Sequence, residues 1–137
     1  LYLSAFFERN RQTYYDLMLS VSQNGNWRDW LLFFLQGVTE QSKDAVIRSK
    51  QLQDLQIQWR EKFTQPRGSA SPLRLVDSLF EAPILNIPQA QEILSVTYPS
   101  AQKNIEKLVT AGILVQARDA SYGKVFLAPE VLKIIGE

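Results

Sequence analysis

The stretch PILNIPQAQEILSVTYPSAQKNIEKLVTAGILVQARDASYGKVFL, residues 83–127, contains the signals that decide the fold. Pro88 suits the first turn of a helix, where its missing N–H has no hydrogen bond to lose. Residues 95–97 then read as a turn, and Pro99 opens a second helix. Gly112 stands where a glycine in the left-handed region commonly ends a helix. The stretch therefore predicts two helices joined by a short turn.

Two β-prone runs follow, residues 113–117 and 124–127, and they flank a turn-rich loop at 118–123. This pattern predicts a β-hairpin. Three further elements complete the unit: a helix over 73–81, a one-step strand at 84–85 and a last helix over 130–135. The order is typical of a winged helix-turn-helix domain with a small hairpin wing, which we predict for residues 73–137.

The helix that starts near Pro99 divides into two faces by its spacing. We expect a buried apolar stripe of Ala101, Ile105, Leu108 and Val109. The opposite, exposed face is expected to carry the candidate DNA-binding residues Ser100, Lys103, Asn104 and Lys107. Asparagine can pair with adenine in the major groove, and lysine can contact guanine or phosphate. Polar residues also line any ordinary surface helix, so the order of elements carries most of this prediction.

Two cations, Arg118 and Lys124, stand at the base of the predicted hairpin. They could contact phosphate or the minor groove, or be ordinary solvated charges on a strand edge. From residue 98 to 124 four Lys and Arg oppose two Asp and Glu, a balance of +2. A monomer should therefore bind DNA weakly and lose it with salt, whereas a dimer would present two such faces.

The N-terminal part predicts a helical hairpin with one long helix, so the whole chain is expected to be mainly α. Residues 5–22 place Phe6, Tyr14, Leu17 and Val21 on one helical stripe. Residues 24–26 supply a turn, with Asn26 as a candidate N-cap. Residues 27–63 then lack proline and predict a long helix. Residues 65–72 read as a linker, which leaves 1–64 as a helical segment.

One narrow apolar seam follows the long helix. It recurs every seven residues at Leu31, Val38, Ala45, Leu52 and Trp59, with Phe34 and Leu55 in a second row. The seam favours packing against the first helix and the later domain. The alternative is a self-associating helix pair, which would make the protein a homodimer.

Composition excludes several classes of function. The 137 residues carry a net charge of +1, which gives no general attraction to DNA or anionic lipid. The absence of Cys and His removes thiolate nucleophiles, the commonest general base and the commonest metal ligand. We therefore expect no catalytic residue and no metal site in this chain. No apolar run is long enough to span a membrane, and the lack of Cys is compatible with a cytoplasmic location.

Two sets of residues resemble the Fic family. The first follows the pattern of the segment after the Fic catalytic loop, and it comprises Leu1–Ser4, Asn10-Arg11, Tyr14–Met18, Gly25–Trp30 and Phe33–Val38. The second, TYPSAQKNIEKLVTAGILV at 97–115, resembles the winged-helix tail of many bacterial Fic proteins. The resemblance covers nearly the whole chain.

The resemblance implies a parent protein that transfers AMP from ATP, with Mg²⁺, to a protein hydroxyl. The family's catalytic loop, H-P-F-x-[D/E]-G-N-G-R, is absent from this chain and would lie upstream of Leu1. Tyr14 and Tyr15 match residues near the adenine side of the nucleotide site, or they are simply aromatic packing residues. The chain is then expected to be a non-catalytic regulatory, DNA-binding module next to an upstream Fic domain. Alternatively, it is an interaction or dimerisation module that packs on the Fic domain without binding DNA.

Overall fold

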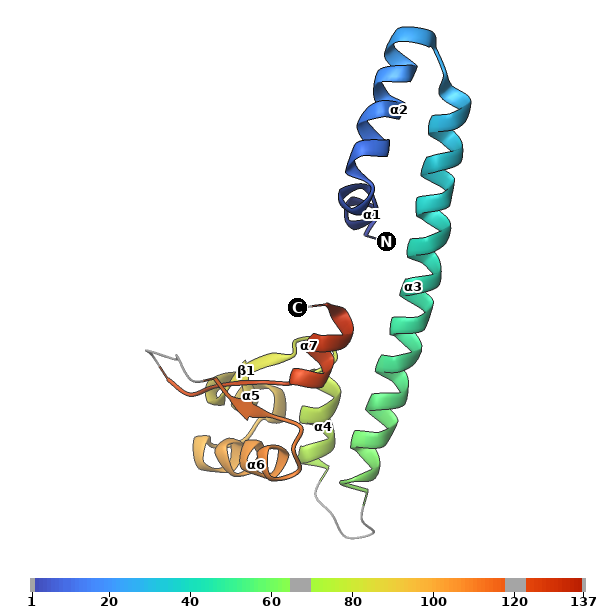
Figure 1. The fold of residues 1–137 in the computed structure, drawn as a ribbon. Coiled ribbons are helices and arrows are strands. Elements are labelled where there is room, and N and C mark those ends of the chain that lie inside the picture. Colours follow the sequence, from blue (N-terminus) through green and yellow to red (C-terminus); the bar gives the residue numbers. More distant parts are fainter. Residues whose placement is uncertain (1, 65–69, 118–122, 137) are drawn as a thin grey trace. The chain divides into compact units, whose positions relative to one another are not determined.

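Helices make up most of the chain, and one small antiparallel sheet completes it (Figure 1). The computed structural model describes residues 2–64, 70–117 and 123–136. The chain forms two compact units, residues 1–49 and 50–137, with the division inside the long helix α3 (Trp27–Glu61). The expected mainly α class is confirmed. In the described ranges no helix is both long and apolar enough to cross a membrane.

The first unit contains α1 (Leu3–Arg9), α2 (Arg11–Asn24) and the beginning of α3. A single helix over 5–22 was the wrong prediction, because the chain breaks at Asn10. The Asn10 backbone leaves the helical region (φ −113°, ψ 33°), and its side-chain amide donates to the carbonyl oxygen of Phe6 at 2.9 Å. Asparagine competes for backbone partners in this way and weakens helix interiors. At the end of α2, Gly25 adopts φ 64° and turns the chain towards α3.

An aromatic cluster joins the helices of the first unit. The Phe6 ring centroid lies 5.0 Å from that of Phe33, and the Tyr14 centroid lies 5.4 Å from that of Trp30. Phe6 is 1% exposed and Phe33 is 8% exposed. Gly37 lies directly beneath the Phe6 ring, where an added Cβ would approach Phe6 Cδ1 to 2.6 Å. The absence of a side chain at Gly37 thus lets α1 pack closely on α3.

Gln41, one turn beyond Gly37, is a buried polar residue of the same contact. With its amide oriented to match its neighbours, its side-chain nitrogen donates to the carbonyl oxygen of Tyr2 at 3.1 Å, and its oxygen accepts from Arg9 Nη2 at 3.0 Å. Both ends of the amide are therefore paired, as burial requires. These bonds tie the two ends of α1 to α3.

The second unit gathers the C-terminal turns of α3 and every later element. Leu55 and Trp59 of α3 are buried in its core, together with apolar residues of the helices and strands that follow. Those elements are α4 (Ser71–Ser78), β1 (Ile84–Asn86), α5 (Ile87–Leu94), α6 (Tyr98–Thr110), β2 (Val115–Gln116), β3 (Val125–Leu127) and α7 (Pro129–Ile135). Helices α4, α5 and α6 pack on one another. The predicted linker lies partly outside the described residues, and its last two residues already belong to α4.

The three strands form a sheet in the order β1-β3-β2 (Figure 1). Strand β3 pairs antiparallel with both neighbours, with Leu85 opposite Phe126 and Val115 opposite Leu127. The Ala117 N–H extends the second ladder to the carbonyl oxygen of Val125 at 2.9 Å. The predicted hairpin and the predicted strand after Pro83 are confirmed. Of the predicted loop between β2 and β3, residues 118–122 lie outside the described residues.

Local signals fix the ends of α5 and α6. Asn86 caps α5 by a reciprocal pair of hydrogen bonds with Gln89, each between a side chain and a backbone N–H. Ser95 then takes the left-handed conformation (φ 56°) and starts the turn into α6. Thr97 occupies the N-cap position without a side-chain cap bond, and Gly112 follows the helix at φ 74°. The turn and the glycine end of α6 are as predicted.

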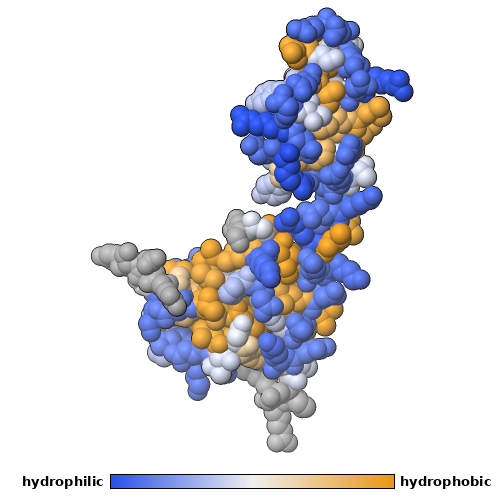
Figure 2. All heavy atoms as spheres, viewed as in Figure 1, coloured by the Kyte–Doolittle hydropathy of each residue, from blue (hydrophilic) through white to orange (hydrophobic). Residues whose placement is uncertain are grey.

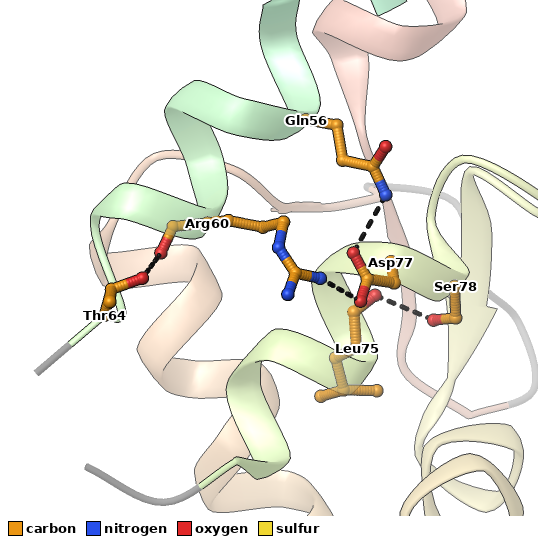
Figure 3. Close-up of polar contacts among 6 residues, drawn as sticks. All are labelled: Gln56, Arg60, Thr64, Leu75, Asp77 and Ser78. Atoms are coloured by element: carbon orange, nitrogen blue, oxygen red, sulfur yellow. Dashed lines mark hydrogen bonds and ion pairs between the residues drawn. The ribbon is translucent and has the colours of Figure 1, made fainter. Parts of the chain in front are cut away.

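A polar contact joins the end of α3 to α4 inside the second unit (Figure 3). Gln56 Nε2 donates to Asp77 Oδ1 at 2.9 Å, and the Arg60 guanidinium forms an ion pair with the other carboxylate oxygen. Partial burial raises the pKa of Asp77, but these two hydrogen bonds and the charge of Arg60 outweigh it, so the net pKa lies below the ordinary value. The contact therefore stabilises the fold at pH values above the ordinary pKa of a carboxyl group. This stabilisation is lost as the pH falls through the lowered pKa of Asp77.

The predicted seven-residue seam is only partly correct. Of its first-row members Trp59 is fully buried, whereas Leu31 is 53% exposed and Ala45 is also exposed. The buried positions of α3 are instead Phe33, Gly37 and Gln41 in the first unit and Leu55 and Trp59 in the second. A straight α-helix drifts by about 20° per heptad, so a strict seven-residue row cannot stay on one buried side.

Candidate nucleic-acid interface

Helix α6 presents one polar side to solvent and one apolar side to the core. Ala101, Ile105 and Leu108 are fully buried against α4 and α5. Lys103 and Lys107 are exposed on the outer side, as predicted. A helix held in this way by its back can offer its outer side chains to a groove of nucleic acid.

Asn104 does not belong to that exposed face, contrary to the sequence-based prediction. Its side chain is buried (7% exposed), and its Nδ2 donates to the carbonyl oxygen of Ser100 at 2.9 Å. The physical reason is spacing, because Asn104 lies three residues after Ala101 and four before Leu108, and such positions share one side of a helix. Ser100 is half-buried for the same reason.

The exposed face is therefore rotated relative to the prediction. It contains Gln102, Lys103, Glu106, Lys107 and Thr110, of which Gln102 is half-buried. Gln102 Nε2 donates to Glu106 Oε1 at 2.9 Å, so this face carries a carboxylate beside the two lysines. The sequence-based prediction missed Gln102 and Glu106. They lie three and seven residues after Pro99, so the three residues share one side of the helix. Val109, which was predicted to be buried, is 38% exposed at the edge of this face.

Cations near α6 differ in their availability. Lys124 is exposed just before β3, whereas Arg118 lies outside the described residues. Two further cations are engaged at helix C-termini: Arg74 Nη2 donates to the carbonyl oxygen of Ile93 at 2.6 Å, and Lys62 Nζ donates to that of Ala111 at 3.2 Å. A cation at the C-terminal end of a helix is stabilised by the negative end of the helix dipole. The electrostatic attraction of this face for phosphate is consequently modest.

Tyr14 and Tyr15, assigned to a nucleotide by resemblance, lie on α2. The Tyr14 ring packs between Phe7 and Trp30, with centroid distances of 5.1 Å and 5.4 Å. Tyr15 is 55% exposed, and the Arg11 guanidinium carbon lies 5.7 Å from its ring centroid. A half-buried ring packed against two aromatic neighbours is poorly placed to stack on adenine. These residues alone therefore do not fit ATP and Mg²⁺, and their role in a larger site stays a prediction.

No protein-family model matches this chain. The relationship to Fic proteins thus stays a prediction from the motifs. In the part of the chain that the structure describes, no group of three or more His, Cys, Asp or Glu residues is placed to hold a metal ion.

Replacement of Asn104 by leucine tests the buried position. The Asn104 Oδ1 atom is buried and has no hydrogen-bond partner among the residues that the structure describes, and an unsatisfied buried acceptor is costly. We expect Asn104→Leu to raise the free energy of unfolding by about 1 kcal/mol, measured by thermal and urea denaturation. Asn104→Asp, which would bury a charge, should lower it. A destabilised leucine variant would show that this oxygen has a partner in solution.

Proposed function

We propose that residues 73–137 are a winged helix-turn-helix module that binds duplex DNA through α6. The observation that carries the proposal is the combination of an apolar back on α6 with an outer face bearing Lys103 and Lys107. The element order supports it, because α5, a three-residue turn and α6 are followed by the β2–β3 hairpin. Strand β1, which precedes α5, pairs with β3 as the third strand of the sheet. This arrangement is typical of modules that insert their second helix into the major groove.

The expected binding mode follows from the exposed face. Lys103 would contact guanine or phosphate, and Glu106 would accept from the cytosine amino group. Lys107 and Lys124 would contact backbone phosphates. With so few cations, one module neutralises only a few phosphates, and its affinity should fall steeply between about 50 mM and about 200 mM salt.

The test is a fluorescence-anisotropy titration with labelled duplex DNA at those two salt concentrations. Lys103→Glu should weaken binding by at least about tenfold and reduce the salt slope by about 1 or more, because one phosphate or base contact is replaced by repulsion. Lys133→Glu on α7 makes the same change in net charge at an exposed site of another helix, and it should have a smaller effect. No binding by the unmodified protein at the lower salt concentration would reject the DNA function.

The module is proposed to regulate a Fic-family protein that transfers AMP from ATP. Two groups of motif residues support this placement, those of the first unit and those of residues 97–115. Among the former, Phe33 and Trp30 take part in the aromatic cluster with Tyr14. The general base, the phosphate-binding loop and the metal ligand of such an enzyme would come from its catalytic loop, whose histidine this chain lacks. This chain would direct the enzyme through its contacts.

A second candidate is a protein-interaction module that does not bind DNA and packs on the Fic domain. The observation that favours it is Glu106, whose carboxylate lies on the outer side of α6 and opposes phosphate. Glu106→Gln separates the two readings in the same titration. DNA binding predicts a tighter non-specific complex when the carboxylate is removed, whereas an interaction module predicts no complex for either protein.

A further inference from the structure

The first unit leaves several large apolar side chains exposed. Its buried hydrophobic side chains in the described range are Phe6, which is 1% exposed, and Phe33, which is 8% exposed. On α3 alone, five large aliphatic side chains of the same unit are more than half exposed: Leu31 at 53%, Leu32 at 56%, Leu35 at 56%, Val46 at 69% and Ile47 at 57%. Figure 2 shows apolar side chains at the surface of this unit. Contiguous apolar surface of this kind marks an interaction site.

The exposed residues form a regular seam, which we call the outer seam. It consists of Leu31, Leu35, Val38, Ser42, Ala45 and Ser49, which alternate in steps of four and three. Over this short span the seven-residue repeat drifts by only about 50°, so the six residues stay near one side of the helix, and the spacing is that of helix–helix pairing. All six are exposed or half-buried, and none is charged. The outer seam lies away from Phe33, Gly37 and Gln41, which face α1.

The outer seam is complementary to itself when two copies run antiparallel. Positions whose numbers add up to 80 then lie opposite each other across a two-fold axis at residue 40. Large side chains meet small ones in every layer: Leu31 faces Ser49, Leu35 faces Ala45, and Val38 faces Ser42. The sum of 80 applies to the outer seam itself. On the flank formed by Leu32, Thr39 and Val46 the nearest partners add up to 78, so Leu32 meets Val46 of the other copy and Thr39 meets its own equivalent. This arrangement would cover four of the five exposed aliphatic side chains, whereas Ile47, on the opposite side of α3, would stay exposed.

The available area agrees with a modest interface. A large aliphatic side chain carries on the order of 100 Å² of apolar surface, so the four side chains that the pairing covers offer roughly 250 Å² per copy. Two copies give roughly 500 Å² from these positions, about half of the roughly 1,000 Å² at which specific interfaces begin, so the smaller residues and both flanks must supply the rest.

We propose that a second copy of this chain covers the outer seam, by antiparallel pairing of α3 over residues 31–49. The contact is isologous, so the same residues of both copies form it and no further copies are added. Each assembly carries two α6 helices. The pairing does not depend on DNA binding, and a failure of either proposal leaves the other standing.

Sedimentation equilibrium of the full chain measures the pairing. The unmodified protein is expected to sediment at twice the chain mass near about 100 µM and to dissociate on dilution, as a modest interface requires. Leu35→Lys places a charge in the outer seam and should give a monomer. Gln36→Lys is the matched control, since Gln36 is an exposed neighbour on the other side of the helix, and it should leave the dimer unchanged. Circular dichroism of both variants shows that they are folded.

Cross-linking between introduced cysteines tests whether the two helices run antiparallel. The chain has no cysteine of its own, so only the introduced residues can react. With a short bismaleimide, Thr39→Cys should cross-link to its own copy, and Glu40→Cys on the far side of α3 should not. Leu32→Cys alone should also fail, but a mixture of Leu32→Cys and Val46→Cys should cross-link. A monomer at every concentration, a dimer that survives Leu35→Lys, or self-linking of Leu32→Cys would each overturn the proposal; the first would indicate a different protein on the outer seam.

Discussion

Trp59→Ala is expected to unfold the second unit or to lower its free energy of unfolding by about 3–5 kcal/mol. Trp59 is 1% exposed, and its ring centroid lies 5.3 Å from that of Phe80, across the contact between α3 and the helices that follow. Removal of the indole leaves a cavity that the surrounding core cannot fill completely. A loss of this size is comparable to the whole stability of a small domain. Any binding through α6 would be lost with the fold.

Urea denaturation followed by far-ultraviolet circular dichroism measures the effect. The matched control is Ile57→Ala, two residues away on the same helix, because Ile57 is 58% exposed and its removal leaves no cavity. We expect the control to change the unfolding midpoint only slightly. Equal effects of the two substitutions would mean that Trp59 does not belong to this core.

Gly37→Ala is expected to separate α1 from α3 in the first unit. Alanine favours the helix over glycine by about 1 kcal/mol, so the substitution would be stabilising at an open site. Here the new Cβ would lie 2.6 Å and 2.8 Å from two carbons of the Phe6 ring, which is itself buried and packed on Phe33. Overpacking of this kind costs about 1–3 kcal/mol, so we expect a net loss.

Near-ultraviolet circular dichroism reports the loss, because α1 contributes Phe6 and Phe7 to the aromatic cluster. Phe6→Leu in the Gly37→Ala background should recover part of the stability, since the smaller side chain gives space to the methyl group. Gln36→Ala, at an exposed neighbouring position, should be neutral. An unchanged signal for Gly37→Ala would mean that α1 does not pack on α3 at this point.

The elements of the second unit were predictable from sequence wherever a local signal marks their ends. Pro88 and Pro99 lie in the first turns of α5 and α6, and Gly112 follows α6 at positive φ. Each of these residues restricts its own backbone, so no distant contact is needed to place the boundary. The hairpin follows for the same reason, from β-prone runs on both sides of a turn.

The failures concern residues whose position no single-residue signal decides. Asn10 reads as a helix interior residue, and its bond to the Phe6 carbonyl oxygen, four residues earlier, accompanies the break. The orientation of α6 depends on the helices behind it, so Asn104 could be assigned to either side from polarity alone. The buried positions of α3 depend on its packing partners, α1 near Gly37 and the later helices near Trp59, and the sequence of α3 alone identifies neither of them.

The participation of α3 in the core of the second unit limits where the chain can be divided. Leu55 and Trp59 precede the linker, whereas the remaining core residues, from Leu75 onwards, follow it. A protease that cuts between them breaks one covalent connection and leaves the buried contacts in place. The two pieces should then stay associated through this non-covalent core. A shortened protein that begins at residue 71 would lack Leu55 and Trp59 and would expose the apolar side chains that pack on them.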